Sequence, residues 1–83
     1  MTDAGNLSIT VGEPNWAPLE SVLSREECAD YMYMGRVGHL ELYKHHETRR
    51  YLNISADGSR FYLYREGQYV EVTRAVALQH VQH

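Results

Sequence analysis

The sequence predicts an α+β fold, with an N-terminal helix, a four-stranded antiparallel meander and a C-terminal helix, both helices on one face of the sheet. Two observations predict the sheet. Apolar and polar residues alternate in four short segments after Gly38, and Asp57-Gly58 and Glu66-Gly67 are dipeptides that favour two-residue hairpin loops. A third observation predicts the first helix, because Ser24 and Glu27 have the spacing of a capping box.

Length and composition predict one folded domain. The chain has 83 residues, of which 43% are apolar and 23% are charged, a balance typical of globular proteins. We expect a loose N-terminal arm over residues 1–13 and a single α+β domain over residues 14–83. A domain of this size buries only about 60% of its unfolded surface, which favours self-association.

Cysteine content and hydropathy predict a cytoplasmic protein with no membrane anchor. Cys28 is the only cysteine, so an intramolecular disulfide cannot form and a reducing compartment is favoured. The first residues lack the basic start and apolar stretch of a signal peptide, and no apolar run approaches the roughly 20 residues that span a bilayer.

The first helix is predicted to begin at Ser24 and to continue through Met34. Leu23 and Cys28 fit the hydrophobic staple that accompanies a capping box, and Gly35 is suited to the left-handed conformation that ends a helix. The preceding stretch from Trp16 is interrupted by prolines, and we expect it to pack on the core without being fully helical.

The four strands are predicted at residues 39–44, 50–55, 60–65 and 68–72. The two glycine-containing loops place Tyr51 opposite Tyr64 and Tyr64 opposite Tyr69. The first hairpin is expected to have a five-residue loop, His45 to Arg49, because a four-residue loop would mix the apolar and polar faces.

The expected hydrophobic core is one face of this sheet, covered by both helices. Thr73 is expected to cap the C-terminal helix, whose Ala75, Val76, Leu78 and Val81 turn toward the core. The core residues expected from the strands are Leu40, Leu42, Leu52, Ile54, Phe61, Leu63, Val70 and Val72.

The other face is predicted to be rich in tyrosine. Tyr43, Tyr51, Tyr64 and Tyr69 form one row across the four strands, and a second row reads Glu41, Asn53, Tyr62, Glu71. Tyrosine gives a large contact area with few torsions to restrict, which favours a binding surface. The structural alternative is that strand tyrosines simply stack on one another across the sheet.

The sequence therefore predicts a small non-catalytic interaction module that self-associates as a homo-oligomer through its tyrosine-rich face. A different protein is the alternative partner for this face. The candidate interface residues are Tyr43, Tyr51, Tyr62, Tyr64 and Tyr69. A second copy is the least demanding partner, because a two-fold contact packs each tyrosine row on its equivalent.

The alternative is single-stranded nucleic acid bound by the same face. Residues 1–34 carry six carboxylates and one arginine, a net charge of −5, whereas residues 35–83 carry seven bases and five acids, a net charge of +2. Aromatic platforms with basic rims are typical of such sites. Against this alternative, Glu41 and Glu71 are expected on the same face and the whole chain has a net charge of −3.

A basic hairpin tip is the second candidate site, for an anion such as phosphate or a carboxylate. Its residues are Lys44, His45, His46, Arg49 and Arg50. The alternative is a solvated turn whose charges oppose edge aggregation. The histidines lack metal-ligand spacing, and the sequence has no glycine-rich phosphate loop or nucleophile elbow, so we expect no metal, no cofactor and no catalysis.

Overall fold

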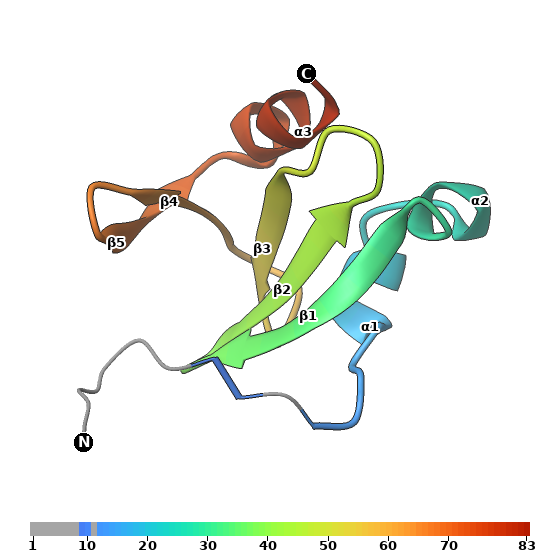
Figure 1. The fold of residues 1–83 in the computed structure, drawn as a ribbon, viewed down its shortest axis with the longest axis horizontal. Helices are drawn as coiled ribbons and strands as arrows, with labels where there is room; N and C mark the ends of the chain where they lie inside the picture. Colours follow the sequence, from blue (N-terminus) through green and yellow to red (C-terminus); the bar gives the residue numbers. More distant parts are fainter. Residues whose placement is uncertain (1–8, 11) are drawn as a thin grey trace.

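The computed structural model describes residues 9, 10 and 12–83, and over these it shows an α+β fold with helices flanking an antiparallel sheet (Figure 1). The sheet has five strands in the order β1-β2-β3-β4-β5, not the four predicted. The elements are α1 (Ala17–Glu20), α2 (Arg25–Cys28), β1 (Tyr31–Val37), β2 (Leu40–His45), β3 (Tyr51–Ser55), β4 (Phe61–Arg65), β5 (Gln68–Val72) and α3 (Arg74–Gln82).

The additional strand, β1, replaces the second half of the predicted first helix. The capping box is confirmed, since Ser24 Oγ accepts from the Glu27 N–H at 3.1 Å and Glu27 Oε1 accepts from the Ser24 N–H at 2.9 Å. The helix nevertheless ends at Cys28, so the predicted continuation to Met34 is wrong. Aromatic residues alternate with methionines from Tyr31 onward, and this two-residue period is typical of a strand.

Gly35 adopts a positive φ of 113°, but it belongs to an irregularity in β1 and not to a helix end. The register between β1 and β2 shifts between Tyr33 and Gly35, as in a β-bulge. Beyond the bulge, Arg36 exchanges two backbone hydrogen bonds with Thr10, each 2.9 Å long. Residues 1–8 and 11 lie outside the described part of the chain, so the loose arm expected over residues 1–13 stays a prediction.

The β4–β5 hairpin has the predicted register, with Tyr64 opposite Tyr69 and Leu63 opposite Val70. Glu66 and Gly67 have φ values of 50° and 84°, as a type I′ turn requires at both central residues. In the β3–β4 turn only Gly58 has a positive φ, 81°, so that turn is not the type I′ turn that an Asp-Gly dipeptide favours.

The β3 and β4 strands pair only at Asn53 opposite Tyr62 and Ile54 opposite Phe61, and then they separate. The predicted pair of Tyr51 with Tyr64 is therefore absent from the described ladder. Figure 1 shows the β4–β5 hairpin turning away from β3, with α3 lying over the opening between them. The end of α3 is tied beside the start of β3, because Arg50 Nη1 donates to the His80 carbonyl oxygen at 3.2 Å.

The predicted register between β2 and β3 is wrong by one residue. The loop has four residues, His46 to Arg49, because the His45 N–H donates to the Arg50 carbonyl oxygen at 2.9 Å. Arg49 takes a left-handed conformation with φ 66°. The loop tolerates it because His45 Nδ1 accepts from the N–H groups of Glu47 and Thr48, at 3.1 and 3.3 Å.

This shift turns every β2 side chain to the opposite face from the one predicted. Tyr43 pairs with Leu52, so it packs in the core, and Leu42 pairs with Asn53 on the other face. Apolar side chains can point to either face of β2 because the strand is buried on both faces. The Tyr43 hydroxyl donates to the Asn15 carbonyl oxygen at 2.7 Å, which satisfies its buried oxygen.

The main core lies between the sheet and residues of the α1 region and α3. Thr73 caps α3 as predicted, with Oγ1 accepting from the Val76 N–H at 3.2 Å. The helix buries Ala77 and Val81, whereas the expected core residues Ala75 and Val76 are exposed. The core cluster is Leu19, Leu23, Tyr31, Tyr43, Leu52, Ile54, Phe61, Ala77 and Val81. Among the described residues, no helix is long and apolar enough to cross a membrane.

Candidate functional site

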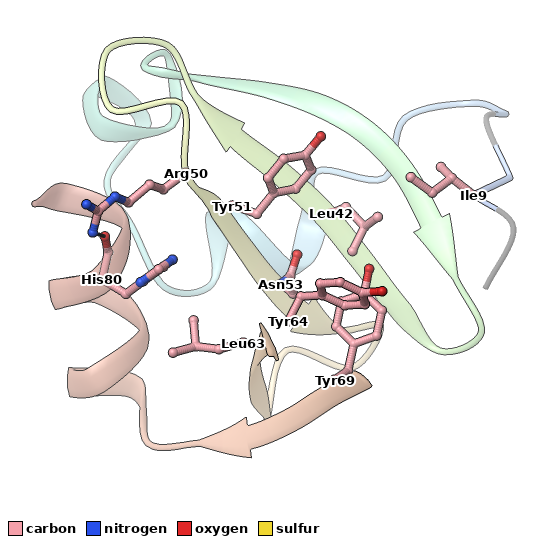
Figure 2. Close-up of a pocket in the computed structure, with 9 residues that line it drawn as sticks. All are labelled: Ile9, Leu42, Arg50, Tyr51, Asn53, Leu63, Tyr64, Tyr69 and His80. Carbon is pink, nitrogen blue, oxygen red and sulfur yellow. Dashed lines mark hydrogen bonds between the residues drawn. The ribbon is translucent and has the colours of Figure 1, made fainter. Parts of the chain in front are cut away.

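A pocket of about 410 Å³ opens where β3 and β4 separate (Figure 2). We call it the tyrosine pocket. It is lined by Ile9, Leu42, Arg50, Tyr51, Asn53, Leu63, Tyr64, Tyr69 and His80. The α3 helix contacts both strands and contributes His80 to the lining. The pocket volume is within the range of about 300 to 1,000 Å³ typical of ligand sites.

Three tyrosines form the aromatic part of the tyrosine pocket. The rings of Tyr64 and Tyr69 are 4.9 Å apart in an edge-to-face arrangement, and Tyr51 approaches from β3. Burial, together with the neighbouring Tyr64 and Tyr51 hydroxyls, raises the pKa of Tyr69. Tyr64 is 54% exposed, so a large aromatic surface stands at the rim of the hollow.

Asn53 lies centrally in the tyrosine pocket and is only 2% exposed. Its Nδ2 donates to the Tyr62 carbonyl oxygen at 3.1 Å, and this contact fixes the amide orientation, since only the NH₂ group can donate to a carbonyl. Oδ1 is then buried with no hydrogen-bond partner in the part of the chain that the structure describes. Such an acceptor is costly unless something supplies a donor.

One side of the tyrosine pocket is positively charged. Arg50 and His80 lie together there, and no carboxylate is found among the described residues of the lining. Partial burial of the ring, together with the positive charges of Arg50 and Arg65, lowers the pKa of His80. An anion would be favoured at this end by simple electrostatics.

The structure divides the five predicted interface tyrosines. Tyr51, Tyr64 and Tyr69 meet at the tyrosine pocket, and Tyr62 lies beside it, paired with Asn53. Tyr43 was predicted in the same row, but the register shift buries it completely in the core on the opposite face. Burial raises the pKa of its hydroxyl, and no surface is left for a partner to contact.

The five predicted anion-binding residues are not gathered into one site. Lys44 Nζ lies 5.9 Å from the centre of the Tyr51 ring, whereas His45 packs edge-on against Tyr31 on the other face. Arg50 reaches the end of α3. His46 and Arg49 are exposed in the loop. Arg50 alone of the five lines the tyrosine pocket.

Sequence reasoning missed four contributors to the tyrosine pocket. Leu42 and Leu63 are expected from the sequence in the main core, Ile9 falls in the predicted N-terminal arm, and His80 has no predicted role. Asn53 was placed on the correct face without a role. The available signal was its position, because Asn53 is a polar residue between Leu52 and Ile54 in a strand with neighbours on both sides. A buried polar side chain in such a strand usually has a hydrogen-bond partner.

The chain has no significant match among protein-family models, curated proteins or solved structures. No group of three or more histidine, cysteine, aspartate or glutamate side chains among the described residues is arranged to hold a metal ion. The tyrosine pocket and its surrounding face are therefore the basis for the functional proposal.

Proposed function

We propose that this protein is a non-catalytic binding module whose binding surface is the sheet face around the tyrosine pocket. The observation that carries this proposal is the pocket itself, with three tyrosines and two buried leucines around a few polar groups. Binding sites typically combine a concave, mainly apolar and aromatic lining with a small number of oriented polar atoms.

Cys28, whose pKa is raised by burial and by Glu20 and Glu27, fits an unreactive thiol in a cytoplasmic protein.

The leading partner is a second copy of the chain. Tyr64 projects beside the tyrosine pocket, so the same patch carries both a protruding aromatic ring and a hollow. A two-fold interface requires such self-complementarity, because each copy contributes the same residues. Exposed Ile9 would add apolar area at the rim. Dimerisation would also compensate for the small core of an 83-residue chain.

The test is the molar mass in solution, measured by light scattering over a dilution series. We expect a native dimer, and we expect the Tyr51→Ser, Tyr64→Ser double variant to be a monomer. Val76→Ser is the matched control, because Val76 is an exposed apolar residue of α3 outside the pocket lining, 41% exposed. Circular dichroism must show that each variant is folded.

Two outcomes would contradict self-association through this face. A native chain that stays monomeric at all concentrations excludes it. A dimer that persists in the folded double variant moves the interface elsewhere. The next surface to test is the edge of β5, which pairs with no strand other than β4 in the described part of the chain.

Single-stranded nucleic acid remains the second candidate, and one observation favours it. Glu41, expected on the tyrosine-rich face, is instead buried on the core side, where Arg36 Nε lies 3.2 Å from its Oε2. Lys44 stays on the tyrosine side with Tyr51. Binding to nucleic acid would weaken steeply with added salt through counterion release, whereas an apolar self-contact would not.

A further inference from the structure

The buried acceptor in the tyrosine pocket specifies what a ligand must carry. Asn53 Oδ1 has no N–H or O–H donor among the described residues, and one N–H of its own NH₂ group donates to the Tyr62 carbonyl oxygen. Oδ1 is covered by its neighbours in the ligand-free chain, so a complementary ligand displaces a covering side chain and presents a donor at this point. In the bidentate pair of asparagine with adenine, this oxygen accepts from the exocyclic amino group of the base.

The shape and lining of the pocket favour a flat ring. Tyr51 and Tyr69 are half-buried and can offer ring surface, and the buried side chains of Leu42 and Leu63 make the rest of the lining apolar. Aromatic side chains that accept a base by stacking are a common feature of nucleotide recognition. The pocket volume of about 410 Å³ is suited to one such unit.

The charge at the pocket's edge favours an anionic group next to the ring. Arg50 uses Nη1 for the His80 carbonyl oxygen, and a guanidinium has five N–H donors in all, so donors remain for a phosphate. His80 lies beside it and the described lining has no carboxylate to repel an anion. Asn53, which lacks a hydrogen-bond donor for its oxygen, and Arg50, which can bind an anion, therefore line the same cavity (Figure 2).

We propose that the tyrosine pocket binds a single nucleotide unit, with the amino group of its base on Asn53 Oδ1, the base against the tyrosines and the phosphate at Arg50. The proposal rests on the proposed function only in using the same face as the binding surface, and it does not require a second copy. The shared chemistry fits either a free mononucleotide or one nucleotide of a single strand.

Calorimetric titration of the native full chain with three compounds tests each contact. Adenosine 5′-monophosphate is expected to bind with a dissociation constant in the micromolar range. Purine riboside 5′-monophosphate lacks only the amino group and should bind at least about tenfold more weakly, because Asn53 Oδ1 then stays unpaired. Adenosine lacks the phosphate and should also bind at least about tenfold more weakly. These ligand changes test Asn53 without a substitution at a buried position.

Arg50→Gln provides the test from the protein side. The substitution should weaken binding of adenosine 5′-monophosphate about as much as removing the phosphate from the ligand does. Binding of adenosine itself should be unchanged. The matched control is Arg60→Gln, since Arg60 is an exposed arginine outside the pocket lining, 3.7 Å from Glu71. Equal effects of the two variants would contradict the assigned phosphate position.

Absence of adenosine 5′-monophosphate binding at millimolar concentration overturns the inference, as does equal binding of the purine riboside compound. The inference can fail in this way while the native chain is a dimer and the Tyr51→Ser, Tyr64→Ser variant is a monomer. In that case the binding surface stands and only its ligand is wrong.

A short oligoadenylate distinguishes a free mononucleotide from one nucleotide of a single strand. Much tighter, steeply salt-dependent binding of the oligomer assigns a strand, and binding no tighter than that of the monophosphate assigns a free nucleotide.

Discussion

Gly58 shows how one residue joins the sheet to the helical layer. Its φ of 81° is in the left-handed region, where a side chain is strained. A Cβ atom at this position would also lie 2.8 Å from Ser21 Oγ, which donates to the Pro18 carbonyl oxygen at 2.7 Å. The β3–β4 turn therefore rests directly on the end of α1, and only glycine allows this approach.

Gly58→Ala should lower the free energy of unfolding more than Gly67→Ala does. Both positions carry the conformational strain, about 1 to 2 kcal/mol, but Gly67 has open space around it. The extra cost at Gly58 is about 1 kcal/mol, because the new methyl group displaces Ser21 Oγ from its hydrogen bond. Urea denaturation measures both values. Ser21→Ala should cost about 1 kcal/mol in the native chain but little in Gly58→Ala, where the hydrogen bond is already lost, and equal costs in both backgrounds would disprove the steric explanation.

At the scale of elements, the β2–β3 loop is held by contacts with α3 that are distant in sequence. Thr48 Oγ1 donates to the Val81 carbonyl oxygen at 2.6 Å and accepts from the Arg50 N–H at 3.2 Å. These bonds satisfy a carbonyl at the end of the helix, where backbone acceptors lack partners within the helix. The loop and α3 consequently support each other at the mouth of the tyrosine pocket.

Thr48→Val should destabilise the fold by about 1 to 3 kcal/mol, because the methyl group cannot replace either hydrogen bond. Hydrogen exchange should show the same change locally, with faster exchange of the Arg50 amide. Thr48→Ser keeps the hydroxyl and is the matched control, which should retain the slow exchange. Fast exchange in both variants would indicate that the threonine methyl group, and not the hydroxyl, holds the loop.

The elements that sequence predicted well depend on local rules. Glu66-Gly67 and the Ser24–Glu27 capping box specify their structures within a few residues, and both are confirmed. The β2–β3 register failed because Arg49 takes a left-handed conformation that only the bonds of His45 and Thr48 make acceptable. The strand at Tyr31–Val37 was missed because a good helix start was extended into a segment that alternates with period two.

At the scale of the whole molecule, β2 is buried on both faces, which an argument from one apolar face cannot foresee. The tyrosine-rich face and four of its tyrosines could be predicted, since that required only strand alternation. The pocket could not be predicted, because it lies where β3 and β4 separate and combines Leu63 of β4 and His80 of α3 with Asn53 of β3. No local sequence pattern encodes that separation.

Folding stability should rise with pH from acid to neutral solution. Hydrogen bonds from Ser55 and Ser59 hold the pKa of Asp57 well below its usual range, and bonds from Ser24 lower that of Glu27. The unfolded carboxylates titrate near about pH 4, so the stabilisation they give is complete above that pH and is lost as pH falls through the folded pKa values.

The pKa of the exposed His80 is also lowered, by partial burial of its ring and by the positive charges of Arg50 and Arg65, and its effect on stability has the same sign. Because the unfolded histidine takes up its proton near about pH 6.5, before the folded one does, acidification through that region favours the unfolded chain. Urea denaturation at a series of pH values should therefore show two losses on acidification. Asp57→Asn should reduce the loss below about pH 4, and His80→Gln should reduce the loss between about pH 7 and 5. A native stability that is constant between about pH 7 and 5 would mean that the pocket does not disfavour the charged imidazole.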